Sequence, residues 1–158
     1  MKWDKFTLMS QDAFQLARSK AEDLGHQEIT PEHLLWAFLE QKENVVQSVL
    51  SKIGVRPSEI KSDLETSFGK IPKVQGSEEV YLSSNLQQIM KNAQKEADKF
   101  KDEFISTEHL FLALFKDSSS RASKILTDSG VTEDAFLKAL MLIRGNQRIT
   151  DAEPEGKY

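Results

Sequence analysis

The sequence predicts an all-α fold made of two related four-helix units, about eight helices in total, joined by a linker. Three observations support this prediction. Apolar residues recur every three to four positions in segments that end at glycine, as in amphipathic helices. No alternating apolar and polar run is long enough to indicate a strand. The stretch from Ile29 to Ala37 also returns as Ile105 to Ala113, which indicates an internal duplication.

The duplication extends well beyond this stretch. The two copies lie 76 residues apart, from Ile29 to Ile105, and the same offset pairs further identical residues without a gap. Since the identities run along both halves, each half should fold as the same supersecondary unit. The additional pairs are Gln11 with Gln87, Ala17 with Ala93, Ala21 with Ala97, Leu50 with Leu126, Gly54 with Gly130, Val55 with Val131 and Leu64 with Leu140.

The first half, about residues 5–68, divides into four predicted helices. Thr7 is a suitable N-cap for the first, which ends before Gly25. Thr30 caps the second, which has Pro31 in its first turn and is apolar on most sides, so it should form the buried centre of its half. The other two are expected at about residues 44–53 and 57–68.

The second half repeats this order after a linker. Residues 69–80 contain Pro72 and two glycines and show no helical pattern, which is typical of a connection between units. After Gly145 the helical pattern is lost again, so we predict one domain over residues 1–145 and a flexible tail over 146–158. Within the second repeat, about residues 81–144, helices are expected at about 84–100, 107–115, 121–129 and 132–143.

Composition restricts the function classes. The chain of 158 residues has a net charge of -4, whereas a nucleic-acid binder would normally be basic, so we expect no nucleic acid. It has no cysteine, which excludes disulfides and zinc-thiolate sites and is compatible with a reducing cytosol. No signal peptide and no long apolar run is present, so we expect no membrane segment and a cytoplasmic location.

Motifs that would carry chemistry are absent. The Gly69-Lys70 pair has Leu64, not glycine, at the upstream position that a P-loop requires, and no H-E-x-x-H motif is present. We therefore predict no catalytic residue, no metal ligand and no cofactor in this chain, and the chain itself should not be an enzyme. The enzyme hypothesis would require a catalytic activity that is lost when His33 and His109 are mutated.

The two Glu-His pairs, Glu32 with His33 and Glu108 with His109, leave three interpretations open. Neighbouring residues on a helix point about 100° apart, which argues against both members holding one metal ion. Structural capping is the simplest account, with each histidine at the N3 position as a cap partner or packed on the other half. A third is that the two glutamates are exposed and hold a cationic group. His26, in a turn, is expected in solvent.

Apolar residues at the start of each half allow two interpretations. They include Trp3, Phe6 and Leu8 in the first half, and Tyr81 with Leu82 in the second. In one interpretation they close the ends of the helical bundle. In the other, part of them lines a groove for apolar peptide segments.

With these residues laid out, the chain resembles the Clp N-terminal domain, a double four-helix repeat at the head of AAA+ unfoldases, and it is most similar to the ClpB disaggregase branch. The resemblance covers residues 1 to about 145, and the segment that follows is similar to the ClpB stretch that leads into the first ATPase module. Its marks are Asp4-Lys5-Phe6-Thr7, Gly25-His26, Pro31-Glu32-His33-Leu34-Leu35, Phe104-Ile105-Ser106-Thr107-Glu108-His109-Leu110 and Ile143-Arg144-Gly145-Asn146-Gln147-Arg148-Ile149-Thr150.

The resemblance implies a pseudo-twofold double repeat that recognises substrate and leaves ATP hydrolysis to modules outside this chain. Its partners would be unfolded or aggregated proteins and, for the full-length protein, the DnaK chaperone system. The full-length protein would be a homohexamer, whereas the isolated domain should be monomeric. The tail over 146–158 would lead to the first ATPase module, where ATP would bind.

The resemblance also implies substrate-binding roles for Thr7, Asp102 and Glu108, to which Glu32 is added as the matching glutamate of the first repeat. Two alternatives remain open: docking of folded adaptor proteins, as in the ClpA and ClpC branches, and binding of phosphoarginine by both glutamates, as in ClpC. One face of the helix before Asp102 is more polar than an apolar peptide-binding groove would be, because it carries Asn92, Lys95, Glu96 and Lys99.

Overall fold

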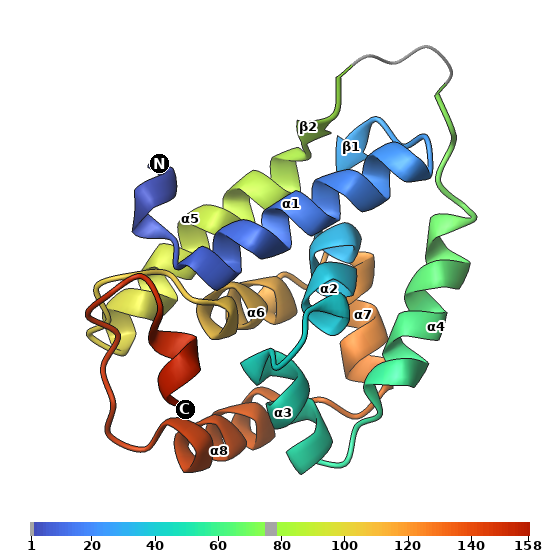
Figure 1. Ribbon diagram of the computed structural model, residues 1–158. Coiled ribbons are helices and arrows are strands. Elements are labelled where there is room, and N and C mark those ends of the chain that lie inside the picture. The colour runs from blue at the N-terminus through green and yellow to red at the C-terminus, as the bar shows by residue number, and fades with distance from the viewer. Residues whose placement is uncertain (1, 75–78) are drawn as a thin grey trace.

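A computed structural model describes residues 2–74 and 79–158 of the chain (Figure 1). Within these residues there are eight α-helices, two strands of two residues each and two short 3₁₀-helices. In chain order they are η1 (Trp3–Lys5), α1 (Leu8–Asp23), β1 (Glu28–Ile29), α2 (Pro31–Glu40), α3 (Val45–Lys52), α4 (Pro57–Phe68), β2 (Tyr81–Leu82), α5 (Ser84–Lys99), α6 (Thr107–Lys116), α7 (Arg121–Asp128), α8 (Glu133–Arg144) and η2 (Pro154–Lys157).

The predicted all-α fold class and its eight helices are confirmed, with ends that differ from the expected ones by a residue or two. The helix starts follow the expected capping chemistry. Thr7 and Ser83, which are equivalent by the 76-residue offset, accept hydrogen bonds from the backbone N–H groups of Ser10 and Leu86 at the starts of α1 and α5. The two short strands were not predicted, because two residues carry no period.

The backbone pairing shows the twofold relation between the halves directly. In the parallel pair of β1 and β2, Ile29 lies opposite Leu82. An isolated parallel bridge joins Phe6 to Ile105. Ile105 is equivalent to Ile29 and Phe6 to Leu82, so each half receives the same contact from the other.

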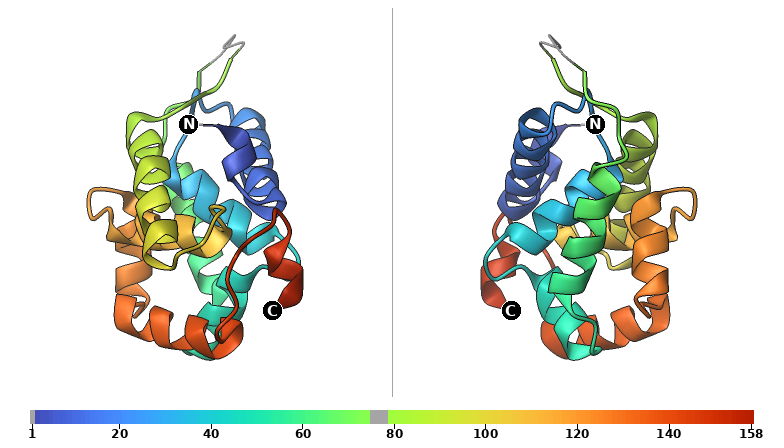
Figure 2. Two further views of the ribbon diagram at one scale, coloured as in Figure 1. Left: turned by 90° about the vertical axis from the view of Figure 1, so that its left-hand side faces the viewer. Right: turned by 90° about the vertical axis from the view of Figure 1, so that its right-hand side faces the viewer.

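The two halves share one core and interlock. Helices α1 and α5 lie at one end of the molecule, α3 and α8 lie at the other, and α2 and α6 lie between them (Figures 1 and 2). Helix α3 of the first half packs against α8 of the second half, and α4 of the first half packs against α7 of the second half. The central helices are buried on most sides, as their all-round apolar sequences predict, and their side chains join a continuous hydrophobic cluster.

Two segments lie outside the paired helices, the linker and the tail. The linker predicted over 69–80 includes residues 75–78, which lie outside the described residues. The prediction of a loose tail over 146–158 is wrong for its later part, because Ile149, Pro154 and Glu155 are buried against the domain. Ile149 has no exposed surface, and a buried aliphatic side chain of this size contributes favourably to packing. Sequence periodicity did not reveal this contact, since the tail docks without forming a long helix.

Candidate functional site

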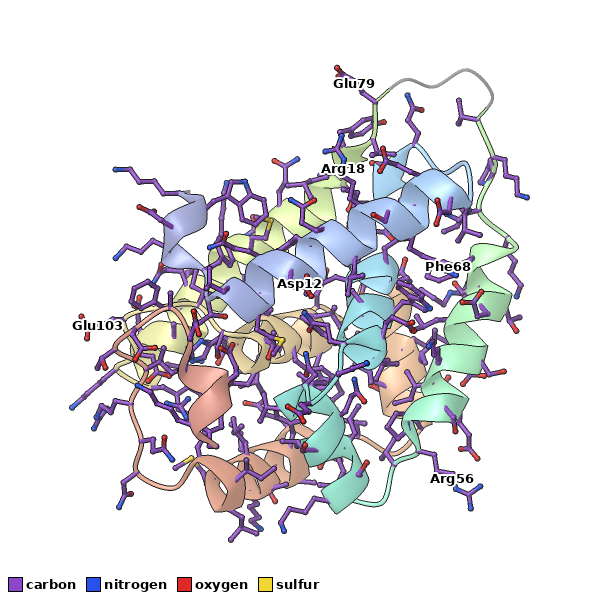
Figure 3. The ribbon with its side chains drawn as sticks, in the orientation of Figure 1. Asp12, Arg18, Arg56, Phe68, Glu79 and Glu103 are labelled. Carbon is purple, nitrogen blue, oxygen red and sulfur yellow. The ribbon has the colours of Figure 1, made fainter. Side chains whose placement is uncertain are left out.

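The first Glu-His box is a buried cap for α2. The backbone N–H of Thr30 donates to His33 Nδ1 at 2.9 Å, which leaves the ring proton on Nε2. Nε2 lies 2.9 Å from Nδ1 of His26, and the His33 ring stacks on Phe68, which lies on the side of α4 that faces α2 (Figure 3). Burial, with the nearby charges of His26 and Lys20, lowers the pKa of His33 to about 3, so the ring is neutral. The expectation that His26 is in solvent is wrong, because only 2% of it is exposed.

The second box repeats this cap with a different partner. The backbone N–H of Ser106 donates to His109 Nδ1 at 2.9 Å, and Nε2 lies 2.7 Å from Asp102 Oδ2. Asp102 occupies the position equivalent to His26, so a carboxylate replaces an imidazole. The capping interpretation is therefore confirmed for both histidines. Each ring nitrogen of His33 and His109 already has a protein partner, and the residues that the structure describes contain no group of three or more His, Asp or Glu side chains placed to hold a metal ion.

Asp102 is also the centre of a buried ion pair. Its two oxygens accept hydrogen bonds from Arg144 Nη1 and Nη2, each at 2.8 Å, and Oδ1 also accepts from the backbone N–H of Ile149 at 3.0 Å. Burial alone would raise the pKa of Asp102, but the hydrogen bonds from His109 and Arg144 outweigh it and lower the pKa to about 2. Only 6% of Asp102 is exposed, so in this conformation its carboxylate oxygens accept hydrogen bonds from within the domain.

The remaining predicted site residues are buried as well. Glu32 Oε2 accepts a hydrogen bond from the backbone N–H of Ala122 at 3.0 Å, so a first-half glutamate caps the start of second-half helix α7. Burial raises the pKa of Glu32. Glu108 and Thr7 lie elsewhere, beneath the C-terminal segment: Tyr158 donates to Glu108 at 2.7 Å, and Thr7 donates to Glu155 at 2.7 Å.

The structure thus brings three of the four predicted residues into one neighbourhood. Asp102 and Glu108 both contact Arg144, at 2.8 and 3.5 Å, and Thr7 lies under the same C-terminal segment. Glu32 is separate, at α7. Their roles in substrate binding stay predictions, because none is exposed here. Sequence reasoning missed Arg144, Glu155 and Tyr158, since their partners lie tens of residues away and no periodic pattern marks them.

The surface of the domain has two hollows, one beside η1 and α5 and the other between α5 and α6. One, of about 230 Å³, is lined mainly by apolar side chains from η1 and its surroundings and from the start of α5: Trp3, Phe6, Leu82, Gln87, Met90 and Lys91. We call it the apolar groove. The other, of about 480 Å³, lies between α5, α6 and residues 117–119. It is lined by Asn92, Lys95, Glu96 and Lys99 among others, which confirms the polar character read from the sequence of α5.

Most of the chain matches a known family of domains. The profile of the Clp repeat (R) N-terminal domain matches residues 5–129. The chain belongs to this family. This chain is 37% identical over 153 residues to the chaperone protein ClpB of Bdellovibrio bacteriovorus, and the alignment covers 96% of this chain and 18% of that protein. It is 36% identical over 162 residues to ClpB of Bacillus cereus, covering 100% of this chain and 19% of the relative.

Solved structures show the same fold. The N-terminal domain of Hsp104 from Candida albicans matches with a TM-score of 0.83 and 22% identity, over 95% of this chain and 98% of that one. The ClpV N-domain in a complex with VipB peptide matches with a TM-score of 0.75 and 19% identity, over 92% and 91% of the two chains. The predicted resemblance to ClpB N-terminal domains is confirmed, and the chain spans about a fifth of the length of its curated relatives. Among the described helices, none is long and apolar enough to cross a bilayer.

Proposed function

We propose that this domain binds apolar segments of unfolded or aggregated polypeptides and acts as the recognition head of a ClpB-like disaggregase. The observation that carries the proposal is the apolar groove with an exposed aromatic side chain in its lining. Trp3, which lines the groove, is 49% exposed, although aromatic side chains gain free energy when they are buried. A groove that leaves such groups in water offers an apolar chain a surface on which to bury both partners.

Packed aromatic rings support the apolar groove from beneath. Phe6, which is 1% exposed, forms its floor and packs edge-on against Phe14 of α1, with ring centroids 5.7 Å apart. Trp3 packs against both rings, at 5.4 Å from Phe6 and 5.1 Å from Phe14. The volume of about 230 Å³ fits a few apolar side chains. The affinity of one domain should therefore be modest, since a bound flexible chain loses conformational entropy.

Several features of the larger assembly belong to this proposal. The chain holds none of the phosphate-binding motifs expected of an ATPase, so ATP would bind in modules beyond it. In a hexameric ring, six weakly binding heads would act together through avidity and would deliver polypeptide jointly with the DnaK system. The ClpV N-domain, which has the same fold, forms a complex with VipB peptide, and this supports peptide binding here.

The experiment that tests the proposal compares two exposed apolar residues. Trp3→Ala removes the edge of the groove, whereas Leu142→Ala removes a side chain that is 74% exposed on α8, at the opposite end of the molecule (Figure 1). Binding of reduced, carboxymethylated α-lactalbumin is measured by fluorescence anisotropy, and the fold of each variant is checked by circular dichroism. We expect Trp3→Ala to weaken binding at least about fivefold, from the loss of roughly 1 kcal/mol or more of apolar burial, and Leu142→Ala to leave it unchanged. Equal client affinity of both folded variants would show that the apolar groove is not the binding surface, and it would contradict the proposal.

A further inference from the structure

The end of the chain is held against the domain by its backbone. Ile149 is fully buried, and its N–H donates to Asp102. Beyond this anchor, the N–H of Leu8 at the start of α1 donates to the carbonyl oxygen of Ala152 at 2.8 Å. We call residues 151–158 the strap. Figure 1 shows the strap, in red, lying beside the start of α1.

The strap covers polar groups at the starts of two helices. We call Thr7, Thr107 and Glu108 the strap seat. The Thr7 hydroxyl donates to the carboxylate of Glu155 at 2.7 Å, and the backbone N–H of Thr107 lies near enough to that carboxylate to lower its pKa. The Tyr158 hydroxyl donates to Glu108 at 2.7 Å. Glu155 thus bridges the N-terminal ends of α1 and α6, where a carboxylate is favoured by the unpaired N–H groups and the helix dipoles.

Docking of the strap carries unfavourable contributions as well. Glu108 Oε1 and Thr107 Oγ1 are buried without a hydrogen-bond partner among the described residues. Burial raises the pKa of Glu155 to about 7, and the neighbouring Glu108 carboxylate adds to this shift. The titratable and charged groups that surround Glu155 are Glu108 of α6 and Tyr158, which follows η2, with Arg144 of α8 behind Glu108. These contributions oppose docking, so the strap is easier to release than a fully paired segment.

A released strap would leave a seat with the features of a peptide-binding site. The hydroxyl of Thr7 and the N–H of Thr107 would be free to donate to a carboxylate, and Glu108 would be free to accept from a hydroxyl or an amide. We propose that the strap is an intramolecular occupant of this seat. When it is docked, it excludes other polypeptides. When it is released, an extended peptide that carries a carboxylate takes the place of Glu155. The inference rests on the proposed function, because it adds a second, closable contact to the same client-binding domain.

The test uses the full 158-residue chain and measures docking and binding separately. Glu155→Ala combined with Tyr158→Ala removes both side-chain anchors of the strap. Glu155→Gln is the matched control, because its amide oxygen still accepts from Thr7 without a charge. Docking is measured as the hydrogen-exchange protection factor of the Leu8 amide, with the Thr7 amide, which donates to Ile105 at 3.0 Å, as an internal reference. Client affinity is measured with reduced, carboxymethylated α-lactalbumin.

We expect the double variant to lose at least tenfold in Leu8 protection, to keep the Thr7 protection, and to bind the client at least threefold more tightly. In the wild type, docking should weaken between pH 4.5 and 7, by up to roughly 300-fold for a pKa raised from 4.5 to about 7, and Glu155→Gln should remove this pH dependence.

Equal Leu8 exchange in the wild type and the double variant would show that Glu155 and Tyr158 do not hold the strap against the domain, and it would overturn the inference. Client binding that is unchanged or weaker in the double variant, despite faster Leu8 exchange, would overturn the closing role alone and leave the apolar groove as the binding site. No client binding by any form would overturn the proposed function, and the closing role would fall with it.

Discussion

Replacing Asp102 with alanine should destabilise the domain severely, because the Asp102 carboxylate accepts hydrogen bonds from several buried donors. The guanidinium of Arg144 is 3% exposed and forms two hydrogen bonds of 2.8 Å with this carboxylate. The N–H of Ile149 and Nε2 of His109 lose their acceptor in the same variant. Removing one member of a buried ion pair typically costs about 3–5 kcal/mol, since the other charge stays buried without compensation.

The pKa of Asp102 gives a second measure of the same interaction. It lies at about 2 in the folded protein, below the ordinary value of 3.8. A lowered pKa means that the ionised carboxylate stabilises the folded state above about pH 4, and that this contribution is lost as the pH falls through about 2. The shift corresponds to roughly 2 kcal/mol at neutral pH. Substitution by alanine should cost more than this, because a protonated carboxyl would still accept hydrogen bonds, whereas alanine accepts none.

Urea and thermal unfolding at pH 7, both followed by circular dichroism, measure the effect. At about 2–4 °C per kcal/mol for a chain of this size, the melting temperature of Asp102→Ala should fall by roughly 6–20 °C. The matched control is Asp98→Ala, an exposed position on α5, which should change the unfolding free energy by less than about 0.5 kcal/mol. Adding Arg144→Met to Asp102→Ala should recover part of the loss, because it removes the unpaired charge. A loss below about 1 kcal/mol for Asp102→Ala would refute the reasoning.

Three further predictions concern other parts of the structure. Glu32→Ala should lower the unfolding free energy in urea by about 1–3 kcal/mol, because the N–H of Ala122 loses its acceptor, and Glu32→Gln should cost clearly less; equal losses would contradict the cap across the halves. Gly54→Ala should cost roughly 1–2 kcal/mol because the φ angle of Gly54 is +87°, whereas Gly156→Ala should be nearly neutral in the same assay; a neutral Gly54→Ala would contradict this account of the turn. The raised pKa of Glu155 should lower the unfolding free energy of the wild type, relative to Glu155→Gln, by up to about 3 kcal/mol between pH 4.5 and 7; parallel pH profiles of the two proteins would contradict it.

The sequence predicted the repeat and its helices because their causes are local. Thr7 precedes an apolar periodic segment, Gly54 stops one, and the box around His33 recurs around His109, so caps, stops and buried helices could be assigned by position. The duplication added a check that one helix pattern alone does not provide, since equivalent residues must serve both halves. The symmetric backbone pairs of Ile29 with Leu82 and of Ile105 with Phe6 satisfy that check.

The polar contacts between distant segments could not be predicted in the same way. Arg144 meets Asp102 across 42 residues, and Glu155 meets Thr7 across 148, and no local pattern records either contact. His26 illustrates the same limit, because a histidine in a turn is normally in solvent, yet here it packs against His33. The tail was wrongly expected to be loose for a related reason: its docking depends on single side chains and backbone groups that carry no period.

The central claim is that the domain binds unfolded polypeptide at the apolar groove, and an amide chemical-shift map tests it most directly. The ¹⁵N-labelled domain is titrated with unlabelled reduced, carboxymethylated α-lactalbumin, and shifts and line broadening are followed for every assigned amide. The account predicts that the largest changes cluster at residues 3–6 and 82–91, with smaller changes at Leu8 and along the strap. Changes centred on α4 and α7, or no change when the client is in large excess, would contradict it.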